Sequence, residues 1–182
     1  TFSPDGKSVL LGGIDGTSRL WSTPPHPELS LFNPYGELVA GIAFSPDGKN
    51  LAVTSGFGNE IQIREAGDGK ILRTFPPAVV NYGVRFSPDG RYLLVGDFSG
   101  VARLWDVTSG QEVRQFIHPA GMDIYDAAFS PDGKKILTGG PDQDRKMPVA
   151  QVWNAQTGDL IFNLDLPPHD DPIFGVAFSP NG

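Results

Sequence analysis

Short apolar runs that end in a turn signal recur along the whole chain. The string Phe-Ser-Pro-Asp-Gly begins at Phe2, Phe44, Phe86 and Phe129, and a fifth copy with Asn in place of Asp begins at Phe178. These phenylalanines are 42, 42, 43 and 49 residues apart. A period of this length is typical of architectures that repeat one small structural unit. The sequence therefore predicts four units, at about residues 2–43, 44–85, 86–128 and 129–177, with residues 178–182 starting a further unit.

Each copy of the string predicts a tight turn between two strands of a hairpin. Proline presets φ for the first central position of a type I turn, aspartate tolerates the second, and glycine takes the left-handed position that follows. The phenylalanine ends a first strand, and a second strand follows the glycine. The predicted first strands are Gly41–Phe44, Gly83–Phe86, Ala127–Phe129 and Gly175–Phe178. The predicted second strands are Ser8–Leu11, Asn50–Val53, Tyr92–Val95 and Lys135–Leu137.

Two further strands complete each unit. The third strand ends at Trp21, Trp105 or Trp153, and in the second unit Arg64 stands at the tryptophan position. A glycine five residues later checks this register in three units, at Gly69, Gly110 and Gly158. The predicted fourth strands are Leu72–Phe75, Val113–Ile117 and Leu160–Leu164. Four short strands joined by tight turns leave no place for a helix, so the prediction is an all-β fold.

The third strand and the glycine after it carry a family resemblance that covers essentially the whole chain. The segment Arg103–Gly110, which reads Arg-Leu-Trp-Asp-Val-Thr-Ser-Gly after its Phe-Ser-Pro-Asp-Gly turn, resembles the WD-repeat β-propellers. The Trp-Asp dipeptide itself occurs once, at Trp105-Asp106. The resemblance implies a β-propeller of four four-stranded antiparallel blades, either a partial propeller or half of a larger ring.

The resemblance also implies a polar set that fixes each blade. WD-repeat blades usually hold a hydrogen-bonded His, Ser, Asp and Trp, and the matches here are Asp15, Trp21, Trp105, Asp142, Trp153 and His169. His118 lies near the histidine position of its own unit. The serine position, counted as two residues before the aspartate, holds Gly13, Ser55, Asp97 and Gly140. No unit has the full set, so we expect blades that depend more on packing and turn geometry.

The strand count leaves three ways to close the array. The chain starts and stops inside the same motif, as in WD-repeat propellers whose two ends share one blade. We favour a piece of a longer propeller, because about seven blades are usual in the family and propellers span about 4–8. A homodimer that completes an eight-bladed ring and a closed four-bladed ring are the alternatives. An open array would leave unpaired strand edges.

Composition and charge narrow the choice of partners. The chain has 23 Gly and 17 Pro among 182 residues, as many short strands and turns require. A net charge of −7 argues against nucleic acid and acidic membranes, which both need a positive field. There is no cysteine for disulfides or thiolate metal sites, and no apolar run of about 18 residues that could span a membrane. The compartment stays open, with the cytoplasm favoured.

Catalytic chemistry finds little support in the sequence. The three histidines, His26, His118 and His169, are isolated from one another, so no metal site is predicted. Nucleophile-elbow, P-loop and dinucleotide-binding motifs are absent from the sequence. The loop carboxylates Asp142 and Asp144 fit no calcium-binding loop spacing. We therefore expect no enzyme activity and no cofactor.

Aromatic residues mark a candidate surface for a protein partner. In WD-repeat propellers, the loops before the first strand and after the second open on the face that most often receives partners. Three of the four positions before the first strands are aromatic: Tyr82, Tyr125 and Phe174. Phe57 and Phe98 lie in second-to-third-strand loops on the same face. These rings form an anchor set if exposed together, and the alternative is that they pack between blades.

A second candidate surface is the insertion at residues 141–148, which includes Arg145 and Lys146. Insertions in repeat arrays go to loops, often on the binding face, although a neutral surface insertion is the alternative. Together these features favour a non-catalytic protein-protein interaction scaffold that is part of a larger protein. The alternative is a propeller that binds a small ligand or sugar, or catalyses a reaction, at its central channel. A third possibility is a structural piece whose working face lies elsewhere. The sequence does not name the partner.

Overall fold

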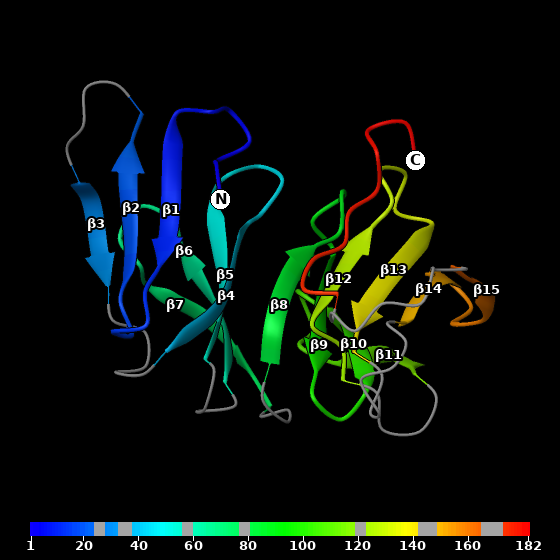
Figure 1. Ribbon diagram of the computed structural model, residues 1–182. Helices are drawn as coiled ribbons and strands as arrows, with labels where there is room; N and C mark the ends of the chain where they lie inside the picture. Colours follow the sequence, from blue (N-terminus) through cyan, green and yellow to red (C-terminus); the bar gives the residue numbers. More distant parts are fainter. Residues whose placement is uncertain are drawn as a thin grey trace. The chain divides into compact units, whose positions relative to one another are not determined.

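The computed structural model describes residues 1–23, 28–32, 38–55, 60–76, 81–118, 123–141, 149–164 and 173–182. Every regular element in these ranges is a β-strand, and neighbouring strands of each sheet run antiparallel (Figure 1). The chain divides into two compact units, Thr1–Phe86 and Ser87–Gly182.

The first unit contains the first two sheets and the first strand of the third sheet, Asn81–Phe86. A three-stranded sheet has the order β1 (Ser8–Gly12), β2 (Ser18–Ser22) and β3 (Glu28–Phe32). A four-stranded sheet follows, in the order β4 (Val39–Phe44), β5 (Asn50–Ser55), β6 (Ile61–Glu65) and β7 (Ile71–Phe75). Each strand pairs with the next one in the chain, as the repeat predicts.

The third and fourth sheets follow the same rule. The third has the order β11-β10-β9-β8, made of β8 (Asn81–Phe86), β9 (Tyr92–Asp97), β10 (Val101–Asp106) and β11 (Glu112–Ile117). The fourth has the order β12 (Asp126–Phe129), β13 (Lys135–Gly140), β14 (Val149–Asn154) and β15 (Leu160–Asn163). The predicted all-β fold of four-stranded antiparallel sheets is confirmed, with three strands described in the first sheet.

The Ser-Pro-Asp-Gly turns share one hydrogen-bond pattern in all four sheets. In each turn the serine hydroxyl donates to the aspartate Oδ1 at 2.5–2.6 Å and accepts the backbone N–H that opens the second strand at 2.9 Å. The glycines Gly6, Gly48, Gly90 and Gly133 have φ between 69° and 72°, the left-handed region expected of them. The hydrogen bond from the serine hydroxyl is the largest contribution that lowers the pKa of the aspartate in each turn. These aspartates are Asp5, Asp47, Asp89 and Asp132.

The cores lie between successive sheets within each unit. In the first unit Leu10 and Leu20 of the first sheet pack with Leu51 and Val53 of the second. In the second unit Trp153 and Phe116 meet edge to face, with ring centroids 5.9 Å apart. The strands β5, β9 and β13 are buried at five of their six residues, so both faces of these strands are covered.

Arg64, at the tryptophan position of the second unit, is buried on β6. Its Nε donates to Gln62 Oε1 at 2.9 Å, and its Nη1 donates to the carbonyl of Gly69 at 2.8 Å. A buried guanidinium needs such partners because its desolvation is costly. Arg64 therefore replaces the packing of an indole with hydrogen bonds to its own hairpin.

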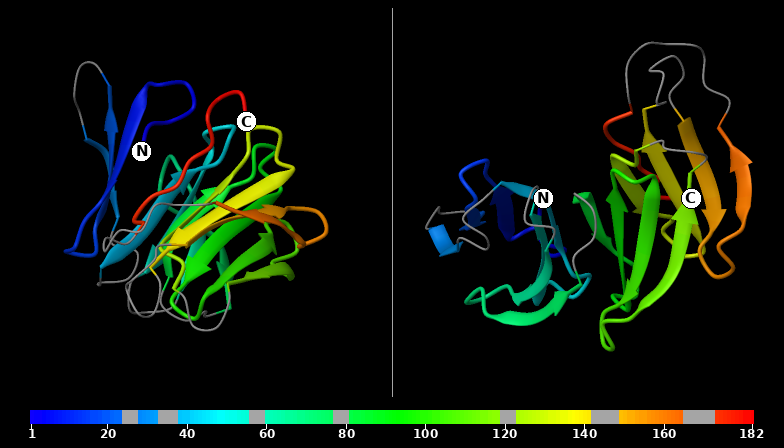
Figure 2. Two further views of the ribbon diagram at one scale, coloured as in Figure 1. Left: turned by 45° about the vertical axis from the view of Figure 1, so that its right-hand side comes forward. Right: turned by 90° about the horizontal axis from the view of Figure 1, so that it is seen from below.

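The prediction of a strand at Gly175–Phe178 is wrong for the described structure, in which residues 173–182 form no strand. A strand requires a neighbour that exchanges backbone hydrogen bonds with it. Here the Val176 N–H donates to the Asp126 carboxylate at 3.2 Å, and Ile173, Val176 and Phe178 pack on Leu137, Ala150 and Val152. Figures 1 and 2 show this terminal segment running beside β12 and β13.

Candidate functional site

Three aromatic side chains from separate stretches of the second unit form a row. The rings of Phe98 and Tyr125 meet edge to face with centroids 6.1 Å apart, and those of Tyr125 and Phe174 stack with centroids 5.6 Å apart. Phe174 is 74% exposed, whereas the other two rings are half-buried. We call Phe98, Tyr125 and Phe174 the aromatic row. The structure thus brings together three of the five predicted anchor aromatics.

Phe98 is positioned by the turn between β9 and β10. The buried carboxylate of Asp97 accepts hydrogen bonds from the N–H of Ser99 at 2.8 Å, the Ser99 hydroxyl at 2.6 Å and the N–H of Val101 at 3.1 Å. Arg103 Nε reaches the other oxygen of Asp97 at 3.2 Å, and its Nη1 contacts Glu112 at 3.0 Å. A buried carboxylate with this many partners fixes the turn that presents Phe98.

Tyr125 is positioned by the short segment that enters β12. The N–H of Ile124 donates to the carbonyl of Asp97 at 3.0 Å, and the N–H of Tyr125 donates to the carbonyl of Gly139 at 2.9 Å. The Ile124 side chain is fully buried in the core of the second unit. Gly140 lies so close that a Cβ there would collide with the backbone carbonyl of Asp123. A glycine at the end of β13 is what allows the segment to approach the sheet.

Phe174 belongs to the terminal segment that lies beside β12 and β13. Its neighbours Ile173 and Val176 pack on the fourth sheet, and Gly139 leaves the space that they use: a Cβ there would lie 2.6 Å from Val176. The Val176 N–H donates a hydrogen bond to the Asp126 carboxylate. These contacts fix the backbone on which an exposed ring is presented.

Asp123 lies two residues before Tyr125 in the segment that enters β12. Asp123 and Tyr125 are half-buried, and Ile124 between them is buried. Burial, together with the nearby carboxylate of Asp97, raises the pKa of Asp123.

The fourth sheet contains a buried polar network around Thr138. Trp153 Nε1 donates to the Thr138 hydroxyl at 2.9 Å, and His118 Nε2 lies 2.5 Å from the same oxygen. The His118 and Trp153 rings stack with centroids 6.1 Å apart. His118 is 2% exposed, and burial lowers its pKa to about 4.

Thr138 and His118 correct two details of the sequence analysis. The sequence predicts Gly140 at the serine position of this unit, but the residue that contacts Trp153 is Thr138. The prediction is wrong because it counts residues back from a loop aspartate and does not take strand register into account. Ile136 pairs with Trp153, and Thr138 is the next residue on the same face of β13. The histidine that joins this network is His118, which sequence spacing had placed only near the expected position. Spacing from Phe129 along β13 could have found Thr138.

The other predicted blade-fixing residues have varied surroundings. Asp15 is exposed and accepts hydrogen bonds from Thr17 within its own turn. Trp105 is buried on β10, and the buried indole N–H of Trp21 has no hydrogen-bond partner among the described residues. The remaining predicted site residues lie outside the described residues or, for Tyr82, have no described side chain: Phe57, Tyr82, Asp142, Arg145, Lys146 and His169.

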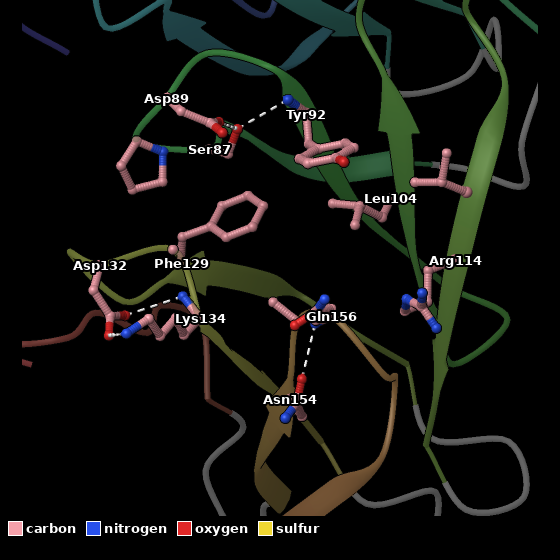
Figure 3. Close-up of a pocket in the computed structure, with 14 residues that line it drawn as sticks. Ser87, Asp89, Tyr92, Leu104, Arg114, Phe129, Asp132, Lys134, Asn154 and Gln156 are labelled. Atoms are coloured by element: carbon pink, nitrogen blue, oxygen red, sulfur yellow. Dashed lines mark hydrogen bonds and ion pairs between the residues drawn. The ribbon is translucent and has the colours of Figure 1, made fainter.

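A cavity of about 500 Å³ lies between the third and fourth sheets (Figure 3). Tyr92, Leu104 and Phe129 form its apolar wall, and Asp89 and Asp132 of two Ser-Pro-Asp-Gly turns lie at its rim. Its volume is in the range of small-molecule sites. This cavity is therefore the described feature to consider for the alternative prediction, a propeller that binds a small ligand or sugar.

An equivalent cavity of about 720 Å³ lies between the first and second sheets. Its lining includes Leu20, Phe44, Asp5 and Asp47, which hold the same positions in their repeats as the residues of the other cavity. The turn carboxylates of both cavities already accept hydrogen bonds from serine hydroxyls. The recurrence indicates that these spaces follow from stacking two blades, and it lends little support to a dedicated ligand site.

The sequence matches a known protein family over most of its length. The family described as "Eukaryotic translation initiation factor eIF2A" matches residues 29–167. The chain belongs to this family. Its curated relatives are WD-repeat proteins, so the resemblance to WD-repeat β-propellers is confirmed.

Three relatives illustrate the range of names. COMPASS component SWD3 of Saccharomyces cerevisiae is 24% identical over 97% of this chain and 61% of its own length. The guanine nucleotide-binding protein subunit beta of Solanum tuberosum is 23% identical over 100% of this chain and 51% of its own. WD repeat-containing protein slp1 of Schizosaccharomyces pombe is 28% identical over 79% of this chain and 29% of its own. The chain thus spans less than two thirds of each of these relatives.

Among solved structures, Kuenenia stuttgartiensis Hydrazine Synthase matches with a TM-score of 0.82 over 89% of this chain and 47% of its own, at 16% identity. This similarity establishes the β-propeller fold alone.

Within the described ranges there is no helix that could cross a membrane. Nor do three His, Asp or Glu side chains gather there as a metal site would require.

Proposed function

We propose that this propeller is a non-catalytic protein-interaction scaffold and that the aromatic row is part of the surface that receives its partner. The observation that carries the proposal is the meeting of Phe98, Tyr125 and Phe174, with Phe174 74% exposed. Buried aromatic anchors supply most of the binding energy in protein interfaces.

The backbone under the row supports this role because it is held in place before any partner arrives. Asp97 closes the turn of Phe98, the Gly139 carbonyl binds the N–H of Tyr125, and Asp126 binds the N–H of Val176 near Phe174. A preorganised surface loses less conformational freedom on binding.

Several described titratable side chains support a non-catalytic role because they make structural hydrogen bonds. His118 is buried against Thr138 and Trp153, and Asp97 closes a turn. The aspartates of the four Ser-Pro-Asp-Gly turns bind their serines.

The names of the relatives support the scaffold more than any single activity. One is a component of COMPASS and another is a subunit of a guanine nucleotide-binding protein. The family description refers to translation initiation. These contexts differ, and what the proteins have in common with this chain is the repeated propeller unit. We therefore propose only the scaffold role for this chain.

Affinity capture with the full chain tests the proposal. The Tyr125→Ala/Phe174→Ala variant should lose specific partners that the unmodified chain recovers, because removing interface anchors typically weakens binding by about 30-fold or more. Phe162→Ala is the matched control, since Phe162 is an exposed phenylalanine on β15 of the same unit. Circular dichroism and thermal unfolding must show that both variants are folded. Unchanged recovery by a folded row variant would rule out the row as the docking surface.

A further inference from the structure

The strand β15 forms the outer edge of the fourth sheet (Figure 1). Among the described residues, the only strand that pairs with it is β14. The Leu164 N–H donates to the carbonyl of Ala150 at 2.9 Å, and backbone groups alternate in direction along an antiparallel strand. The N–H and C=O of Asn163 therefore point away from β14, where a further strand could pair with them.

The strand β15 differs from the other three outer strands in having no charged residue. Glu28 belongs to β3, Arg73 to β7, and Glu112 and Arg114 to β11. Phe162 takes the register position that Arg73 and Arg114 hold in their sheets. Charged residues in an edge strand oppose pairing with another chain, and β15 lacks this protection.

The side chains of β15 are exposed along the whole strand. Leu160, Ile161 and Phe162 are 44%, 47% and 48% exposed, and Leu164, which follows the strand, is 40% exposed. Burial of this apolar surface is favourable. A helix could cover the side chains but would leave the outward backbone groups unpaired, whereas an added strand satisfies both.

We propose, on the basis of the proposed function, that β15 accepts an extended segment of the protein partner as a fifth strand of the fourth sheet. The segment has apolar residues at alternate positions and a lysine or arginine at each end. Main-chain hydrogen bonds hold it in place, and its apolar side chains lie beside those of β15.

Charge favours a basic partner segment over a second copy of this chain. The sequence has an aspartate on either side of the apolar segment, at Asp159 and Asp165, and the whole chain has a net charge of −7. Pairing two copies would bring like charges together, which is unfavourable. A segment with basic ends instead gains from these charges.

The direct experiment is a titration of the full chain with the acetylated and amidated peptide Lys-Val-Thr-Val-Thr-Val-Lys, followed by NMR. We expect saturable shifts of the Asn163 backbone amide and slower hydrogen exchange of its N–H when the peptide is bound. The same peptide with Glu in place of both Lys residues should bind about 2- to 5-fold more weakly.

Two pairs of variants test the edge. Asn163→Pro removes the outward N–H and should weaken peptide binding by about 2- to 12-fold or more, whereas Asn163→Ala removes the same side chain, keeps the N–H and should retain binding. Phe162→Arg supplies the charge of the other outer strands and should also weaken binding. Phe162→Ala keeps the backbone edge, so its affinity should change by no more than about 5-fold. Circular dichroism must show that each variant is folded, and Phe162→Arg decides if Asn163→Pro is not.

Each contrary result has a definite meaning. Equal peptide affinities of folded Asn163→Pro and Asn163→Ala would overturn the inference, as would a peptide that causes no saturable shift at Asn163. If the Glu peptide binds as tightly as the Lys peptide, the choice of basic ends is wrong. A doubled mass in light scattering that Asn163→Pro returns to the single-chain mass would mean that a second copy occupies the edge, and the inference would fail. The proposed function is judged separately, because the Tyr125→Ala/Phe174→Ala variant used for affinity capture leaves β15 unchanged.

Discussion

Mild acid should destabilise this protein through a single buried histidine. His118 is 2% exposed, and burial lowers its pKa from 6.5 to about 4. In the unfolded chain the same ring takes up a proton near its ordinary pKa of about 6.5. Between these two values the unfolded state binds more protons than the folded state, so the free energy of unfolding falls as the pH falls.

The size of the effect follows from the difference between the two pKa values. The contribution is fully present above the unfolded pKa and is lost as the pH approaches 4. At about 1.4 kcal/mol per unit of pKa, the whole loss is about 3 kcal/mol, of which about 2 kcal/mol is lost by about pH 5. That is a large share of the stability of an ordinary domain, which is about 5–15 kcal/mol.

Urea unfolding at a series of pH values measures this loss. The comparison is with His118→Gln, whose amide keeps a hydrogen-bonding group near Thr138 but does not titrate. The variant should be less stable at neutral pH, and its disadvantage should shrink by about 2 kcal/mol between about pH 8 and pH 5. The tryptophan signal is suitable because the His118 ring stacks on Trp153 at a centroid distance of 6.1 Å.

Parallel pH profiles for the two proteins would refute the reasoning, because they would mean that His118 does not titrate differently on unfolding. An NMR titration gives an independent check on the folded chain. A His118 ring pKa near 6.5 in the native state would refute it as well.

Three further outcomes are expected. Ser87→Ala should lower the free energy of unfolding by about 1–3 kcal/mol in urea titrations, because its buried hydroxyl both donates to Asp89 and accepts a backbone N–H. The same variant should raise the pKa of Asp89 measured by NMR towards its unfolded value, so that less stability is lost on acidification. Gly140→Ala should cost about 1–3 kcal/mol and displace the Tyr125 segment, since its Cβ would meet a backbone carbonyl, whereas Gly67→Ala, where a Cβ meets nothing within 4 Å, should be nearly neutral. Light scattering should give the single-chain mass of 19.5 kDa, and twice that mass would instead favour the eight-bladed homodimer.

Most of the fold could be predicted because its signals are local. A Ser-Pro-Asp-Gly turn forms from contacts among six neighbouring residues, and strand pairing between consecutive strands follows directly from such turns. The predicted strand at Gly175–Phe178 is absent from the described structure, but the other predicted strands correspond to observed ones. Several of these continue a few residues further, for example β13 to Gly140. The polar and glycine residues at the end of β13 still pair with β14, where Gly140 lies opposite Val149.

The candidate site could be predicted only in part. The aromatic positions were visible as a recurring place in the repeat. Their meeting depends on approaches between chain segments, such as Asp97 with Ile124 and Gly140 with Asp123. Such approaches leave no local sequence signal.

The sequence by itself determined the repeat, the turns, the strand order within each sheet and the absence of thiol chemistry, because each depends on residue identity or on neighbours in the chain. Tertiary structure decided which polar residues meet. It placed Thr138 rather than Gly140 beside Trp153, and it paired Asp97 with Arg103. The reason is physical: hydrogen bonds, burial and charge balance act between segments that only the packed sheets bring within reach.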